Sequence, residues 1–170
     1  VGLSAAHAAT LFEPENIIVG GHHDDRLAIA ETMGATHTIN TSRDDAAELL
    51  AGLTEGRGPQ AVLATISSPE TMAFAAEQIE PGKSVAWVGM EVFLGAPEIP
   101  WDKAFFKNVG VKGGVAPVKS YLPTLWPLLE GGKIDPSPVL THDMSMDEAA
   151  TGYEVMASRQ EGSVKVAITP

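Results

Sequence analysis

The sequence of 170 residues contains no cysteine. Disulfide bonds and thiolate metal sites within the chain are therefore excluded, and the absence fits a reducing compartment. Basic residues are also scarce, because 11 Lys and Arg stand against 22 Asp and Glu, for a formal net charge of −11. This balance argues against a nucleic-acid partner, since phosphate neutralisation needs clustered Lys and Arg.

Long apolar runs are missing as well. No stretch approaches the roughly 18 to 20 continuous apolar residues of a membrane span. The first residues lack the basic start and the cleavage region of a signal peptide. We therefore expect a soluble, cytoplasmic protein without a membrane partner. What the chain does have is 44% hydrophobic and 19% charged residues, a composition typical of a folded domain with a sizeable core.

Helix-like and strand-like segments alternate along the chain. Short, wholly apolar strands are typical of parallel sheets covered on both faces, and their alternation with helices predicts an α/β fold with a doubly wound parallel sheet. The expected strands are 17–19, 37–40, 61–66, 84–89, 109–114 and 164–168. The expected helices are 2–12, 26–33 (capped by Asp24 or Asp25), 44–53, 69–79, 102–106, 120–130 and 146–157. In such sheets ligands bind where strands end and helices begin.

The order of short motifs resembles one known family, the zinc-type medium-chain alcohol dehydrogenases, which are nicotinamide-dependent oxidoreductases. The start of the chain, Val1-Gly2-Leu3-Ser4-Ala5, looks like the end of their Gly-rich dinucleotide loop. Further matches follow in the family's order: Arg26-Leu27, Met33-Gly34-Ala35-Thr36, Leu53-Thr54-Glu55-Gly56-Arg57-Gly58, Pro81-Gly82-Lys83, Val111-Lys112-Gly113-Gly114, Leu140-Thr141-His142 and Val164-Lys165-Val166. The similarity covers nearly the whole chain.

The resemblance implies a Rossmann-like domain at 1–116, truncated at its start, and a C-terminal α/β segment of the catalytic domain at 117–170. It also implies that the first strand of a 3-2-1-4-5-6 sheet is absent, so that ladder groups of its neighbours lack partners. The catalytic domain with its zinc ligands is not represented either. Zinc is therefore expected only outside this chain, which we expect to be inactive alone and to lack catalytic residues.

The function implied is hydride transfer between NAD(P)(H) and a small alcohol, aldehyde or ketone, in a parent enzyme that forms a dimer or tetramer. Two alternatives stay open. One is a zinc-independent, quinone-reductase-like oxidoreductase of the same superfamily. The other is a non-catalytic module kept for oligomerisation.

The most informative local feature is the stretch Gly20-Gly21-His22-His23. In NAD-preferring relatives an acidic residue follows the second strand and binds the adenosine ribose, and here that position is Gly21. A neutral residue with donors close by favours NADP(H), and the candidate donors are His22, His23, Arg26 and Arg43. The competing interpretation is a solvated turn whose acidic residues, Asp24 and Asp25, weaken phosphate binding.

The resemblance implies further cofactor contacts. They are Val1, Gly2 and Lys165 for the pyrophosphate, and Ile66, Ser67, Val88, Gly89, Met90 and Val115 for the ribose and nicotinamide. Each of these has a plain alternative as a strand end, a helix start or a solvated lysine. No metal site is expected, because adjacent histidines lack the three- or four-residue spacing of helical ligands. His7, in an apolar helix, is expected to be a hydrogen-bonded core histidine.

Overall fold

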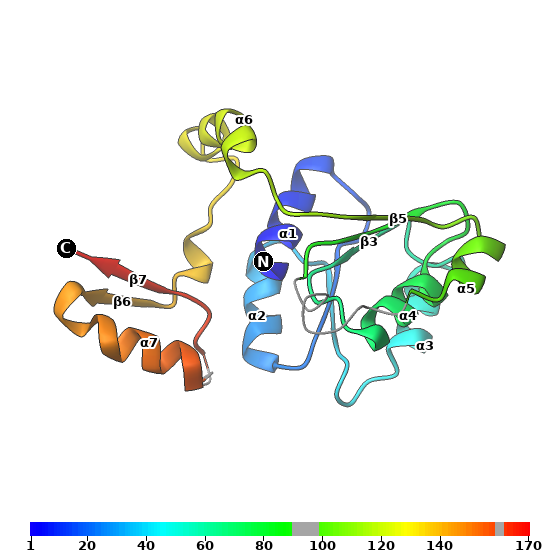
Figure 1. Ribbon diagram of the computed structural model, residues 1–170, viewed down its shortest axis with the longest axis horizontal. Helices are drawn as coiled ribbons and strands as arrows, with labels where there is room; N and C mark the ends of the chain where they lie inside the picture. The colour runs from blue at the N-terminus through cyan, green and yellow to red at the C-terminus, as the bar shows by residue number, and fades with distance from the viewer. Residues whose placement is uncertain (90–98, 159–161) are drawn as a thin grey trace. The chain divides into compact units, whose positions relative to one another are not determined.

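The structure, a computed structural model, describes residues 1–89, 99–158 and 162–170 (Figure 1). The chain forms two compact units, one made of residues 1–44 with 122–170 and the other of residues 45–121. The domain boundary expected between residues 116 and 117 stays a prediction. In the described ranges no helix is both long and apolar enough to cross a membrane.

The N-terminal part of the first unit is a helix–strand–helix–strand arrangement. Its elements are α1 (Gly2–Ala9), the 3-10 helix η1 (Thr10–Phe12), β1 (Ile18–Gly21), α2 (Asp24–Thr32) and β2 (His37–Asn40). β1 and β2 run parallel, with Gly21 opposite Asn40 at their carboxyl ends. Both helices contact β1, and buried Leu27, Ala30 and Met33 form the interior with Ile39 of β2.

A histidine connects this part to the C-terminal part of the same unit. The backbone N–H of Asp135 donates to His7 Nε2 at 2.8 Å, so the ring proton lies on Nδ1, which donates to the Met33 carbonyl at 3.1 Å. Both ring nitrogens are therefore used in holding three segments together. The prediction that the ring is hydrogen-bonded is confirmed, whereas the prediction that His7 lies in the core is wrong, because the residue is half-buried.

The C-terminal part contains a β–α–β unit. Its elements are α6 (Val118–Glu130), the 3-10 helices η3 (Ser137–Val139) and η4 (Met146–Glu148), β6 (His142–Ser145), α7 (Ala149–Ser158) and β7 (Val166–Thr169). β6 and β7 pair in parallel and α7 packs against both (Figure 1). Gly152 permits this packing, since a Cβ there would lie 3.2 Å from Val166 Cγ1.

The second unit holds a three-stranded parallel sheet in the order β3-β4-β5. Its elements are α3 (Ala46–Leu53), β3 (Ala61–Ala64), α4 (Pro69–Gln78), β4 (Ser84–Trp87), α5 (Trp101–Phe106) and β5 (Gly110–Gly113). The core consists of Met72, Ala75 and Ile79 packed on Ala64 and Val85. Ser68 caps α4 by accepting from the Thr71 N–H at 3.2 Å, as its sequence predicts.

The far end of α4 is closed by a lysine. Lys107 Nζ donates to the Glu77 carbonyl at 2.7 Å and to the Ala76 carbonyl at 3.4 Å, and these are two of the carbonyls that a helix leaves unpaired. Partial burial lowers the pKa of Lys107. A cation at this end also complements the helix dipole.

The strand pairing agrees with the expected fold class. A 3-2-1-4-5-6 sheet without its first strand leaves a pair and a triplet of strands, and the structure has the pair β1-β2 and the triplet β3-β4-β5. β1 and β3 are edge strands of their sheets among the described residues. The predicted doubly wound α/β class is thus confirmed.

Two expectations near the end of β1 are wrong. The first strand extends through Gly20 and Gly21 instead of ending at residue 19, because both glycines pair with β2. The cap of α2 is not an aspartate, since His23 holds the N-cap position with an extended backbone and makes no side-chain cap bond. Asp24 and Asp25 are the first helical residues, and their carboxylates bind other segments of the chain.

Candidate functional site

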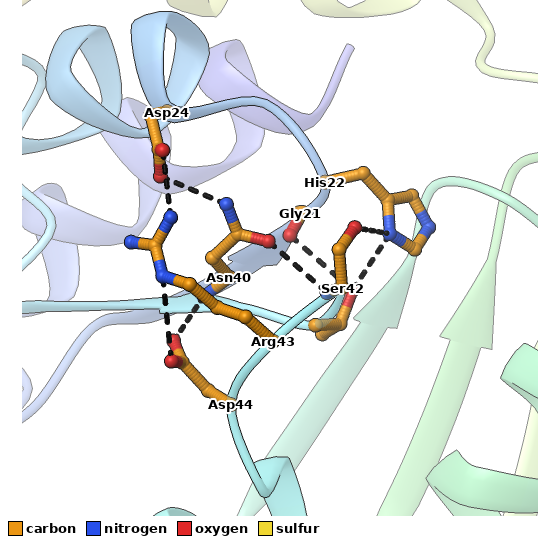
Figure 2. Close-up of polar contacts among 8 residues, drawn as sticks. Gly21, His22, Asp24, Asn40, Ser42, Arg43 and Asp44 are labelled. Atoms are coloured by element: carbon orange, nitrogen blue, oxygen red, sulfur yellow. Dashed lines mark hydrogen bonds and ion pairs between the residues drawn. The ribbon is translucent and has the colours of Figure 1, made fainter.

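The carboxyl ends of β1 and β2 lie together because the two strands are parallel and in register. Residues 22–23 leave β1 and residues 41–44 leave β2, and the side chains of His22 and Ser42 meet at this edge (Figure 2). The arrangement is the one in which open α/β sheets bind ligands. We call residues 21–23 together with 41–42 the Gly21 turn.

Asn40, the last residue of β2, organises this edge. Its side chain is buried, with Nδ2 donating to Asp24 Oδ1 at 2.8 Å and Oδ1 accepting from the Ser42 N–H at 3.0 Å. Its backbone N–H donates to Asp44 Oδ2 at 2.8 Å. One residue therefore fixes the start of α2 and the chain that leaves β2 (Figure 2).

Arg43 lies between two carboxylates. Its guanidinium contacts Asp24 Oδ2 at 2.6 Å and Asp44 Oδ1 at 3.6 Å. The hydrogen bond to Arg43, followed by the one to Asn40, lowers the pKa of Asp24, and the same pairing raises the pKa of Arg43. The positive charge of Arg43 is thus directed to its own neighbours.

His22 lies on the exposed side of the Gly21 turn. Its Nδ1 is 3.0 Å from Thr41 Oγ1 and 3.2 Å from Ser42 Oγ (Figure 2). Thr41 in turn donates its hydroxyl to the Gly21 carbonyl at 3.2 Å. An imidazole and two hydroxyl groups therefore gather beside Gly21, with His23 exposed at the following position.

Gly21 has a packing role at this position. A Cβ added there would lie 3.3 Å from Leu27 Cδ2, which is tighter than an ordinary contact and requires a small shift of the leucine. The absence of a side chain also leaves the strand end without a carboxylate. Gly21 therefore allows close packing with Leu27 and adds no negative charge at the end of β1.

Arg26 is turned to a different place from the one expected. Its Nη2 donates to the Ser163 carbonyl at 3.1 Å, and the neighbouring Asp25 Oδ2 accepts from the Gly162 N–H at 2.7 Å. The bond from Gly162 lowers the pKa of Asp25. Of the four donors expected near Gly21, both arginines are engaged with protein groups and the two histidines stay exposed.

The second unit has its own carboxyl edge, at the ends of β3, β4 and β5. Ser67 Oγ donates to the Gly89 carbonyl at 3.1 Å, which links the segments that leave β3 and β4. The apolar residues expected here are exposed: Ile66 by 51%, Val88 by 44% and Val115 by 85%. Met90, another expected contact, lies outside the described residues.

The remaining expected contacts are in the first unit. Val1 is the N-cap residue of α1 and Gly2 is its first helical residue. Lys165 is exposed, and its backbone is held by Thr141, whose N–H donates to the Lys165 carbonyl at 3.0 Å. None of the described His, Asp and Glu residues form a group of three that would hold a metal ion.

The sequence model of one family, described as zinc-binding dehydrogenase, matches residues 1–131. The chain belongs to this family. Among curated relatives, it is 28% identical over 170 residues to a probable zinc-binding alcohol dehydrogenase of Mycobacterium tuberculosis, covering 100% of this chain and 43% of the relative. It is 30% identical over 165 residues to an L-threonine 3-dehydrogenase of Protochlamydia amoebophila, covering 96% and 47%.

Solved structures of zinc-binding dehydrogenases share the fold. An alcohol dehydrogenase from Thermus sp. ATN1 superposes with a TM-score of 0.90 at 27% identity, covering 99% of this chain and 48% of that one. The chain thus spans about half the length of the curated relatives that it matches, 43% and 47% in the two cases above. The predicted family is confirmed.

Sequence reasoning missed three residues at the carboxyl edge of β1 and β2: Asn40, Thr41 and Ser42. The signal was present, since a polar run follows directly after the strand at 37–40. Such a run at the carboxyl end of a parallel strand is where ligand-binding side chains are expected. Their part in the site follows from the pairing of Gly21 with Asn40.

Proposed function

We propose that the chain is the dinucleotide-binding part of an oxidoreductase that transfers a hydride between NADP(H) and an alcohol or the corresponding carbonyl compound. The observation that carries the proposal is the Gly21 turn, in which a glycine, a histidine and two hydroxyl groups meet at the carboxyl edge of two parallel strands. NADP(H) is favoured over NAD(H). This chain binds the dinucleotide, and turnover of substrate requires a polypeptide of the relatives' length.

The charges around Gly21 support this preference. A carboxylate at that position would repel a 2′-phosphate, and the chain has none there. The carboxylate of Asp24 is directed to Asn40 and Arg43, so its charge is offset by an ion pair (Figure 2). The Thr41 hydroxyl donates to the Gly21 carbonyl, which leaves the His22 ring and the Ser42 hydroxyl to donate to a phosphate.

The other candidate residues extend the proposal along the cofactor. Gly2 opens an eight-residue helix whose first backbone N–H groups are available to a pyrophosphate, with Val1 directly before it. Lys165 adds a cation for the same group. Exposed Ile66, Val88 and Val115 suit the face of an apolar ring, with Ser67, Gly89 and Met90 beside them in the sequence.

When bound, the nicotinamide ring would supply the redox chemistry, as hydride acceptor in the oxidised cofactor and as hydride donor in the reduced one. This chain's residues bind and orient the dinucleotide. The described residues do not fit a zinc site, so no step is assigned to zinc here. We propose that polarisation of the substrate oxygen belongs to a part of the parent polypeptide outside this chain, and that the parent is a homo-oligomer.

Amide chemical shifts of the labelled chain test the proposal. NADPH and adenosine 2′-monophosphate should both perturb residues 21–23 and 41–42, because both carry the 2′-phosphate. NADPH alone should perturb Ser67 and Gly89. A dispersed spectrum that does not change at millimolar NADPH would contradict the proposal and favour a non-catalytic oligomerisation module.

A further inference from the structure

Two adjacent residues of α2 bind two adjacent residues 137 positions away. The carboxylate of Asp25 accepts from the Gly162 N–H at 2.7 Å, and the guanidinium of Arg26 donates to the Ser163 carbonyl at 3.1 Å. Both bonds involve an ionised group, which makes them stronger than neutral hydrogen bonds. We call this pair of contacts the Asp25–Arg26 clamp.

The segment held by the clamp is also fixed from its other side. Thr141 Oγ1 accepts from the Val164 N–H at 2.9 Å and from the Lys165 N–H at 3.3 Å. Ser163, between the two sets of contacts, is 1% exposed. Residues 162–165 are thus seated between α2 and the start of β6, and they lead directly into β7.

The clamp lies next to the Gly21 turn in the sequence. α2 begins at Asp24, directly after His22 and His23, and His23 makes no side-chain cap bond. The orientation of the first turn of α2 therefore sets where these two histidines lie. Asp25 and Arg26 are the second and third residues of that turn, and their other contact is the segment 162–163.

We propose that Asp25 and Arg26 are positioning residues for dinucleotide binding, which they support by docking residues 162–165 against the start of α2. This inference rests on the proposed binding function. Because the same two side chains join both places, dinucleotide binding and the docking of this segment are thermodynamically coupled, and the coupling is reciprocal. Arg26 then acts through the clamp and does not contact the 2′-phosphate.

The role predicts a pattern that a phosphate ligand would not give. Replacing Arg26 or Asp25 by Ala should weaken NADPH and NADH by the same factor, about tenfold, which lies within the usual range of coupling between sites. The double variant should lose little more than either single variant, because one device is broken in each case. Loss confined to NADPH would make Arg26 a direct phosphate ligand and overturn the inference.

The test measures the affinity of the full chain for both cofactors by calorimetry. Glu31→Ala is the matched control, because it removes a carboxylate from the same helix whose partner among the described residues is Thr38 Oγ1 of β2, at 3.0 Å. Asp25→Asn and Arg26→Lys serve if the Ala variants do not fold. These two variants keep the shape of the clamp and weaken its hydrogen bonds. Their affinities for NADPH and NADH should therefore fall by equal factors that are smaller than those of the Ala variants.

Hydrogen exchange gives a readout that loss of stability alone would not produce. NADPH should slow exchange of the 162–165 amides in the wild-type chain and in Glu31→Ala, and not in the clamp variants. Unaltered exchange there when NADPH is bound to the wild type, or clamp variants with wild-type affinity, would refute the inference and leave the binding function standing. A folded wild-type chain that binds neither cofactor would refute both.

Discussion

Replacement of Gly21 by Asp should reverse the cofactor preference. The substitution introduces a carboxylate at the end of β1, where it would face the 2′-position of the adenosine ribose. Two unit charges about 4 Å apart in water interact by about 1 kcal/mol. A 2′-phosphate carries a charge of up to about −2, so the repulsion amounts to about 2 kcal/mol, which weakens NADPH by about 30-fold.

NADH should gain from the same change. Its ribose hydroxyls would donate to the new carboxylate, and a hydrogen bond to a charged group contributes about 1.5 kcal/mol, which is about tenfold in affinity. The ratio of the two affinities should therefore change by about 300-fold in favour of NADH. Salt must be held constant in the comparison, because these charges are exposed and screened.

Gly21→Ala is the control for packing. Its Cβ makes the same 3.3 Å contact with Leu27 Cδ2, at a cost of about 1 kcal/mol, without adding a charge. Calorimetric titration of the three chains with both cofactors gives the ratio directly. An unchanged ratio in Gly21→Asp, or an equal change in Gly21→Ala, would refute the electrostatic reasoning.

Three further predictions concern stability. His7→Ala removes two hydrogen bonds between distant segments and should lower the free energy of unfolding of the first unit by about 1–2 kcal/mol in urea titrations. An unchanged free energy of unfolding would mean that these two hydrogen bonds do not stabilise the unit. Gly113→Ala places a Cβ against the indole of Trp87 and should destabilise the second unit by about 1–3 kcal/mol. The control is Gly114→Ala, whose Cβ meets nothing within 4 Å and should leave the stability unchanged. Hydrogen bonds hold the pKa values of Asp24 and Asp25 below their ordinary 3.8, so their stabilisation is present at neutral pH and is lost as the pH falls below about 4. Urea midpoints from pH 7 to 3 should show that fall, and a midpoint constant to pH 3 would contradict it.

The elements that the sequence predicts well are those set by local chemistry. The helix start at Ser68-Pro69 follows from a capping hydroxyl and a proline in the first turn, and neither depends on distant residues. The strand at 37–40 is found at its expected bounds. The parallel sheet class follows from apolar runs that must be covered on both faces.

The errors occur where distant residues decide. Asp24 and Asp25 have the chemistry of helix caps, but Asn40, Arg43 and Gly162 bind their carboxylates instead. β6 at 142–145 was not expected, because its residues lack an apolar strand pattern and gain that conformation by pairing with β7. Contacts across many residues leave no local pattern in a single sequence.

The same reason explains the candidate site. Gly21 and His22 could be proposed from the sequence because they lie where an apolar run ends, at the position where the resemblance places an acidic residue in NAD-preferring relatives. The direction of Arg26 was not, because its partner Ser163 lies at the other end of the chain. The role of each candidate in cofactor binding stays a prediction.

We propose that this chain binds a nicotinamide dinucleotide through the Gly21 turn. Calorimetric titration of the folded wild-type chain with NADPH and NADH in parallel tests this binding. We expect both cofactors to bind, with NADPH tighter. Tighter binding of NADH would show that the missing carboxylate does not set the preference. Binding of neither, by a chain whose circular dichroism shows an intact fold, would refute dinucleotide binding by this chain.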